Sequence, residues 1–118
     1  MQRDFPNDTD GDALRRFEEN GNDLSRPMLI DFQITVPDET AALALADVAR
    51  KLGYQVRTYA SPECSLPWTC ECSIRMVASY DGVIAVQDEL AGLAGPFGGH
   101  PDGWGSFGNH TNETQSPG

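Results

Sequence analysis

Basic side chains are scarce in this sequence, which has eight Lys and Arg residues against 18 Asp and Glu residues and a formal net charge of −10 at pH 7. The deficit disfavours direct contact with nucleic acids, because Lys and Arg contacts to phosphates supply most of that affinity. An acidic surface instead favours a basic partner and speeds the encounter with it, although the same charge also serves plain solubility.

Long apolar runs are missing as well. The longest covers residues 41–46, far short of the ~20 residues that span a bilayer. The first six residues include an acid and a proline where a secretion signal would need an apolar run. We therefore expect a cytoplasmic protein without membrane contact, in which the three cysteines are reduced thiols and not a disulfide framework.

Signatures of catalysis, metal binding and phosphate binding are absent or incomplete. The two histidines, His100 and His110, have no Ser or Cys at a recognisable acid–base spacing. Cys70 and Cys72 make half of a metal site, for which Cys64 or the histidines would have to complete the ligand set. Both thiols alternate in step with apolar residues, which favours a place in the core. No glycine pattern precedes a helix, as phosphate binding requires, so we predict no catalytic residue, cofactor or metal.

The spacing of apolar residues predicts a leading helix followed by strand, helix, strand, strand, helix and strand. The expected helices run from an N-cap at Asp8 or Asp10 to about Asn20, from Asp38 through Leu52 with Gly53 just beyond, and from Ser79 to just before Pro96. The expected strands are residues 30–36, 54–60, 68–76 and the short stretch 101–107. This βαββαβ order is typical of the ferredoxin-like α+β fold, a four-stranded antiparallel sheet with two helices on one face and strand order 4-1-3-2.

We expect residues 1–109 to form this single domain and residues 110–118 to be a disordered polar tail. The N-terminal helix should pack at an edge or on the remaining face of the sheet. The predicted core positions of the three helices are Leu14 and Phe17, then Ala41, Leu45, Val48 and Leu52, then Val83, Val86, Leu90 and Leu93.

The helix-free face of the sheet should be polar, carrying Asp31, Gln33, Thr35, Glu71, Ser73 and Arg75. RNA-recognition modules share this topology and stack bases on aromatic residues of that face, but here two acids occupy it. We therefore predict no direct RNA binding. A polar, partly exposed face beside an edge strand suits a protein-binding module instead.

The stretch 101–107 is the least ordinary part of the chain, because Trp104 stands between two glycines. Gly103 and Gly105 allow the last strand to bend. Trp104 faces either the helices or the solvent. A buried ring would make this stretch a signature of the fold, and an exposed ring would make it the first candidate for partner contact.

Three short stretches resemble, in the same order, those of the RraB family, regulators of ribonuclease activity that inhibit ribonuclease E: Gly21-Asn22-Asp23, Lys51-Leu52-Gly53-Tyr54-Gln55-Val56 and Asp102-Gly103-Trp104-Gly105-Ser106-Phe107. The arm at residues 5–8 with residues 11–16 resembles the start of shorter, single-domain members. The resemblance covers roughly residues 5–109. It implies a ferredoxin-like fold and a non-enzymatic role, binding ribonuclease E outside its catalytic domain and changing which transcripts are degraded.

The chain departs from the best-known members of that family, because it does not have their long acidic C-terminal tail, and this leaves the specific partner open. The resemblance favours a ribonuclease E-type endoribonuclease as partner, with the protein a monomer or a homodimer. Our candidate partner contacts are Asp23, Asp31, Gln33, Glu71, Asp102 and Trp104. The alternatives are a small-ligand-binding domain, which would need a pocket, and an interaction module for an unrelated cytosolic partner.

Overall fold

The structure is a computed structural model that describes residues 8–106 of the 118-residue chain. The predicted arm before residue 8 and the predicted tail at 110–118 lie outside the described residues, as do Phe107 and His110. All other predicted elements fall within them.

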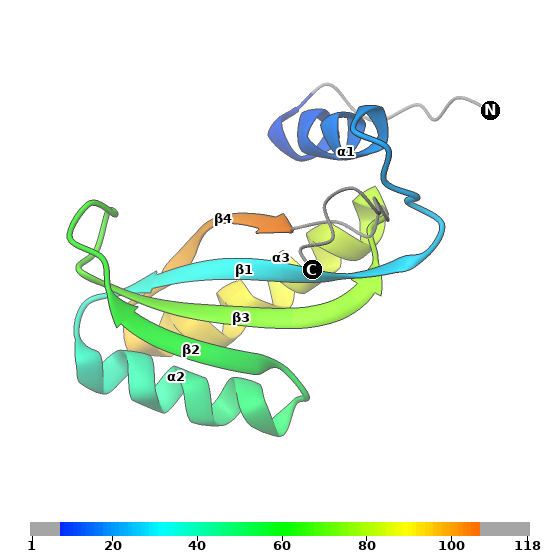
Figure 1. Ribbon diagram of the computed structural model, residues 1–118. Helices are drawn as coiled ribbons and strands as arrows, with labels where there is room; N and C mark the ends of the chain where they lie inside the picture. The colour runs from blue at the N-terminus through cyan, green and yellow to red at the C-terminus, as the bar shows by residue number, and fades with distance from the viewer. Residues whose placement is uncertain (1–7, 107–118) are drawn as a thin grey trace, which may run out of the picture.

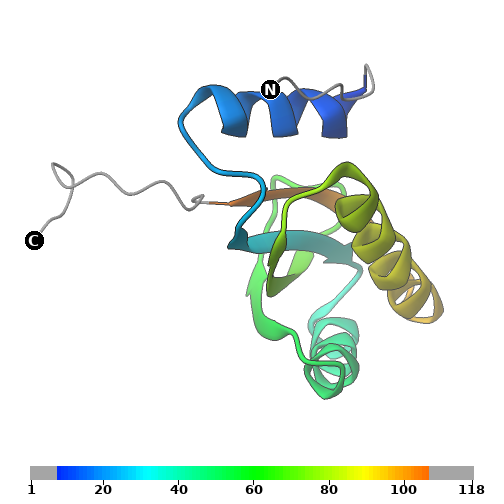
Figure 2. The ribbon, with the colours of Figure 1, turned by 90° about the vertical axis from the view of Figure 1, so that its right-hand side faces the viewer.

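The described elements follow the predicted order (Figure 1). They are α1 (Thr9–Glu19), β1 (Pro27–Val36), α2 (Glu39–Lys51), β2 (Gln55–Ala60), β3 (Trp68–Val77), α3 (Tyr80–Ala94), a 3-10 turn η1 (Gly95–Phe97) and β4 (His100–Ser106). The four strands form one antiparallel sheet in the order β2-β3-β1-β4, as predicted. Figure 2 shows α2 and α3 on one face of this sheet, while the other face carries no helix. The α+β fold class is confirmed.

Side-chain caps begin each helix where the sequence predicts them. Asp8, Asp38 and Ser79 each accept a hydrogen bond from the backbone N–H three residues on, at 2.8, 2.8 and 3.0 Å. These bonds satisfy backbone donors that have no partner inside the helix. Gly21 and Gly53, just beyond the first two helices, have φ angles of 93° and 102°, which an L side chain rarely adopts.

The core lies between the sheet and the two helices that cover it. Apolar residues of β1 and β3 point to this side, and Cys70 and Cys72 are fully buried among them, as predicted. The prediction for α2 was wrong at Leu52, which is 51% exposed, and Val48 is only half-buried and lies outside the core. The helix ends at Lys51, so Leu52 is its C-cap and leaves the buried stripe. Small residues dominate that stripe, which comprises Ala41, Ala42, Leu45, Ala46 and Ala49.

Helix α1 packs beside the β4 edge of the sheet and next to α3 (Figure 2). The buried Leu14 and the half-buried Phe17 face the body, as predicted. Two side-chain hydrogen bonds hold the helix to α3: Tyr80 donates to Asp8 at 2.6 Å, and Gln87 donates to Asp10 at 3.3 Å. The helix therefore lies at an edge of the sheet, which is one of the two positions predicted for it.

Strand β4 contains a bulge that determines where its tryptophan points. Trp104 pairs with Phe32 and Pro101 pairs with Ile34, so two residues, Asp102 and Gly103, oppose the single residue Gln33 of β1. Gly103 has a φ angle of 128°, a conformation that favours glycine. Because Phe32 belongs to the core, Trp104 lies on the helix side of the sheet.

Candidate partner-binding surfaces

On the helix-free face of the sheet, two polar residues of β1 stand directly opposite two polar residues of β3. Gln33 of β1 stands opposite Glu71 of β3, and Asp31 stands opposite Ser73. The Ser73 hydroxyl donates to the Asp31 carboxylate at 2.6 Å. Asp31 and Gln33 are half-buried, so both remain accessible from solvent.

Glu71 is less accessible than the sequence pattern indicates, since only 8% of its side chain is exposed. The guanidinium of Arg57 and the hydroxyl of Tyr59 both donate to its Oε1 atom at 2.9 Å. The Arg57 guanidinium also lies 5.7 Å from the centre of the Tyr59 ring. Burial, and then the hydrogen bond to Glu71, raise the pKa of Tyr59 to about 12. Two side chains of β2 thus cover the carboxylate and compensate its charge.

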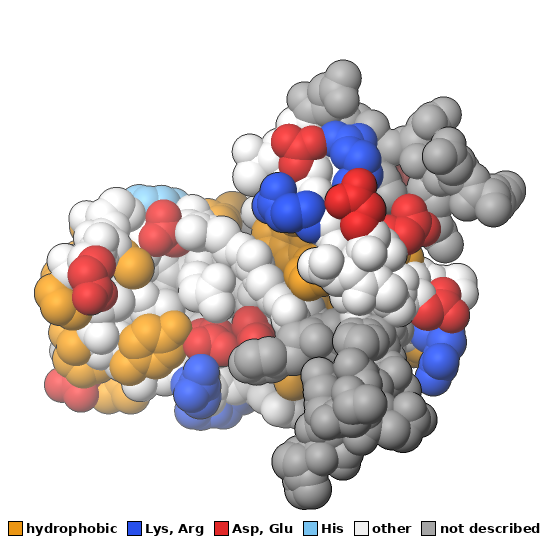
Figure 3. Space-filling view, turned by 45° about the horizontal axis from the view of Figure 1, so that its top comes forward, with side chains coloured by type: hydrophobic (Ala, Val, Ile, Leu, Met, Phe, Trp, Pro, Cys, Tyr) orange, Lys and Arg blue, Asp and Glu red, His pale blue; other side chains and the backbone are white. Residues whose placement is uncertain are grey.

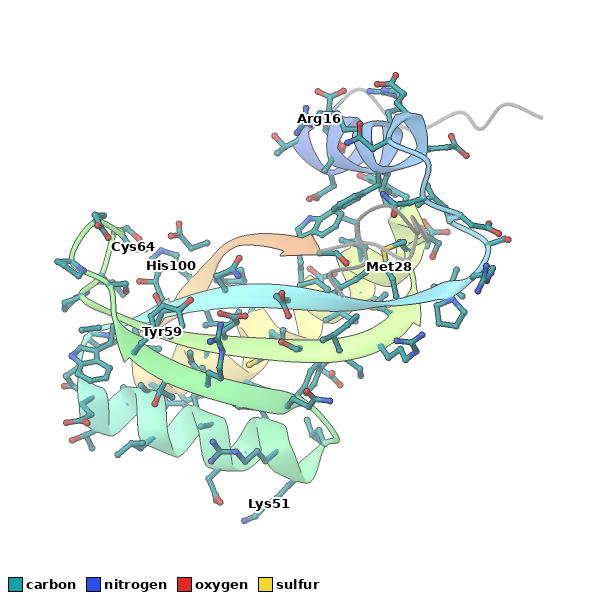
Figure 4. The ribbon with its side chains drawn as sticks, in the orientation of Figure 1. Arg16, Met28, Lys51, Tyr59, Cys64 and His100 are labelled. Atoms are coloured by element: carbon teal, nitrogen blue, oxygen red, sulfur yellow. The ribbon has the colours of Figure 1, made fainter. Side chains whose placement is uncertain are left out.

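The loop between β2 and β3 covers one end of the same face. Thr35 exchanges two 3.1 Å hydrogen bonds with the backbone of Leu66, and Ser65 bonds to His100 at 3.1 Å. Figure 4 shows Tyr59, Cys64 and His100 gathered at this end of the sheet. Thr35, which was expected on an open polar face, is therefore buried. Ser73, further along β3, is also buried.

A second feature is a cleft of about 510 Å³ where α1, α3 and β4 meet. Trp104 is half-buried in its wall, with ring centres 5.7 Å from Phe17 and 6.4 Å from Phe32. The indole Nε1 donates to Asp10 at 2.7 Å. The lining residues are Thr9, Asp10, Ala13, Arg16, Gln87, Pro101, Asp102, Gly103 and Trp104.

The charged side chains of the cleft differ in whether they already have hydrogen-bond partners in the protein. Asp10 accepts from Trp104 at one carboxylate oxygen and from Gln87 at the other, so it is part of the wall. Arg16 and Asp102 are exposed. Within residues 8–106, no side-chain hydrogen bond or ion pair engages either of them, so both can bind a ligand.

The structure separates the six predicted contact residues into three places. Asp102 and Trp104 line the cleft, and Asp31, Gln33 and Glu71 lie on the helix-free face. Asp23 lies in the turn after α1, where its Oδ1 accepts bonds from the N–H and hydroxyl of Ser25 at 2.9 and 2.6 Å. Sequence reasoning missed the cleft residues of α1 and α3, because no local pattern indicates which helix faces meet.

Cys70 and Cys72 are buried free thiols that contact each other. The sulfur atoms of Cys70 and Cys72 are 3.9 Å apart in the core. This contact lowers the pKa of Cys70, whereas it and burial raise the pKa of Cys72. Among residues 8–106, no group of three or more His, Cys, Asp or Glu side chains is placed to hold a metal ion.

A family model described as "Regulator of ribonuclease activity B" (RraB) matches residues 7–106. The chain belongs to the RraB family. The match includes every described helix and strand, and therefore both the cleft and the helix-free face. The RraB family regulates ribonuclease activity, which gives this chain a regulatory role with a ribonuclease.

No curated protein matched the chain in a direct sequence comparison. None of the helices in the part of the chain that the structure describes is long and apolar enough to cross a membrane.

Proposed function

We propose that this protein is a non-enzymatic, cytoplasmic regulator that binds a ribonuclease E-type endoribonuclease and inhibits its cleavage of RNA. The observation that carries the proposal is the RraB match, which spans residues 7–106 and thus the whole described domain. The function lies in a protein contact, for which the candidate residues remain Asp23, Asp31, Gln33, Glu71, Asp102 and Trp104.

The charge of the protein supports a basic protein partner over RNA. The net charge is −10, which repels phosphates and attracts the positively charged surfaces that nucleases present to RNA. Asp31 and Glu71 on the helix-free face also stand where an RNA-binding sheet needs aromatic side chains.

The test is a cleavage assay with purified proteins. Increasing amounts of the chain are added to a ribonuclease E-type enzyme and a labelled RNA, and binding of the two proteins is measured in parallel. We expect the cleavage rate to fall as the complex forms, and the chain alone neither to bind nor to cut the RNA. Full-rate cleavage at concentrations far above those of the enzyme, with no complex detected, would contradict the proposal.

A second candidate function is the binding of a small ligand, which is favoured by the 510 Å³ cleft beside Trp104. Its size is within the range of small-molecule sites. A screen of metabolites by thermal shift would detect such a ligand, because a ligand that binds only the folded state raises the melting temperature.

A further inference from the structure

Negative charge is concentrated on one side of the molecule. The residues from Asp8 to Glu19 and from Tyr80 to Ser106 carry nine acidic and two basic side chains, a net charge of −7. Residues 20–79 carry seven acidic and five basic side chains, a net charge of −2. Helices α1 and α3 and strand β4 lie together in space (Figure 2), so the elements that form the cleft carry most of the negative charge.

The lining of the cleft combines apolar and charged side chains. Its apolar part includes Trp104, Pro101 and Ala13. Figure 3 shows hydrophobic side chains beneath the acidic and basic side chains of α1, where that helix meets the body. The exposed Asp102 belongs to the β4 bulge. The exposed Arg16 extends from α1 (Figure 4).

We propose that this cleft is the docking site for a short basic segment of the protein partner, an inference that rests on the proposed function and gives it a location. The aliphatic part of a Lys or Arg side chain of the segment packs on Trp104 and Pro101, and its cation pairs with Asp102. A cation near the indole face is also attracted by the ring. Arg16 donates to a backbone carbonyl or carboxylate of the same segment.

Charge decides the kind of occupant. The long-range field of the elements that form the cleft, with their net charge of −7, attracts a basic segment and repels an acidic one. The carboxylate of Asp10 already accepts two hydrogen bonds, so Asp102 is the acidic group of the lining that is open to a cation. The helix-free face is a weaker candidate for docking a basic segment. Arg57 already neutralises Glu71 there, and the exposed Arg75 adds a positive charge to the same face.

The central experiment reverses the charge of Asp102 and of one matched control. Asp102→Lys and Glu63→Lys change the net charge equally, and both residues are exposed, but Glu63 lies in the loop beside the helix-free face. Affinity is measured for the ribonuclease E-type partner and for a fluorescein-labelled octapeptide of alternating Arg and Ala. Circular dichroism and melting temperature confirm that both variants fold.

We expect Asp102→Lys to weaken both affinities about tenfold or more, as loss of a partly desolvated charge pair worth about 1.4 kcal/mol would do. Glu63→Lys should change them by less than about twofold, the size of a long-range screened effect. Trp104→Phe, which keeps an aromatic ring, should weaken both affinities less than Asp102→Lys does. A similar octapeptide of Glu and Ala should not bind.

The possible failures are distinguishable. If Glu63→Lys weakens partner binding as much as Asp102→Lys, or if Asp102→Lys has no effect, the docking site is not the cleft, although the regulatory function stands. If the chain binds no ribonuclease but holds the Arg peptide in an Asp102-dependent way, the proposed function fails and the cleft serves another basic partner. A neutral metabolite that raises the melting temperature in a Trp104-dependent way, together with no binding of the Arg peptide, would overturn the assignment of this cleft to a protein segment.

Discussion

The carboxylate of Asp10 accepts a 2.7 Å hydrogen bond from the indole nitrogen of Trp104, which joins the first described helix to the last strand across 94 positions of the chain. The same carboxylate accepts from Gln87 of α3. One side chain therefore connects three elements and shapes the wall of the cleft. A partly buried donor such as this indole N–H is stabilised by a partner in the protein.

We expect Asp10→Ala to lower the free energy of unfolding by about 1–2 kcal/mol, since the lost hydrogen bonds involve a charged, partly buried acceptor. Asp12→Ala is the matched control, because it removes another first-turn acid of α1. The Asp12 carboxylate is 55% exposed and pairs with Arg15 one turn further on, so its loss should cost about 0.5 kcal/mol or less. Urea unfolding measures both. A double-mutant cycle with Trp104→Phe should show coupling, and strict additivity would refute the contact.

Gly103→Ala should destabilise the domain by about 1 kcal/mol or more, because a side chain is strained at a φ angle of 128°. Space is not the reason, since an added Cβ would meet no atom within 4 Å. Gly105→Ala is the control on the same strand. Its Cβ would also meet nothing within 4 Å, and its φ is not in the strained range. Equal melting temperatures for the two variants would contradict the backbone explanation.

Two tyrosines should make stability depend on alkaline pH. Burial, and then a 2.5 Å hydrogen bond to Glu89, raise the pKa of Tyr54 above its usual range. Burial and Glu71 raise the pKa of Tyr59 to about 12. Both hold their protons more tightly in the folded state than in the unfolded state, where the pKa is about 10.

This contribution is fully present below pH 10 and is lost as the pH rises through the folded-state pKa values. We expect the free energy of unfolding to fall between about pH 10 and 12. The fall should be shallower for Tyr54→Phe and Tyr59→Phe, and shallowest when both are combined. Denaturant unfolding at several pH values tests this, and an equally steep fall in the double variant would show that other groups are responsible.

Thiol reactivity should distinguish Cys64 from the other two cysteines. Cys70 and Cys72 have no exposed surface, whereas Cys64 is half-buried in the β2–β3 loop. A thiol reagent such as Ellman's should label one cysteine in the native protein and all three in denaturant. Cys64→Ser should remove the native reaction. Rapid labelling of Cys70 or Cys72 would mean that β3 opens far more easily than a central strand should.

Much of the fold follows from local patterns that the sequence carries openly. Alternation in β1 and β3 places Phe32 and Cys72 in the core, and each N-cap residue lies where the first turn needs an acceptor. These features depend on neighbours within a few positions, so one sequence suffices to predict them. Leu52 is the exception, because the end of α2 falls one residue before it.

The candidate sites were harder to predict, because they depend on contacts between distant residues. The side of the sheet that Trp104 faces depends on a bulge at Asp102 and Gly103, which shifts the alternation by one residue. Glu71 was expected to be exposed, yet Arg57 and Tyr59 of the neighbouring strand cover it. The cleft requires α1 to lie against β4, and no spacing along the chain indicates that arrangement.

The bond between Asp10 and Trp104 also has a consequence for synthesis on the ribosome. Helix α1 emerges early, but its partners on α3 and β4 are translated many residues later. At about 5–20 residues per second, a gap of 94 residues takes roughly 5–20 s. During that interval the apolar side of α1, with Leu14 and Phe17, has no sheet to cover it. The nascent chain therefore exposes this surface until β4 has been translated, and the cleft is the last part of the domain to form.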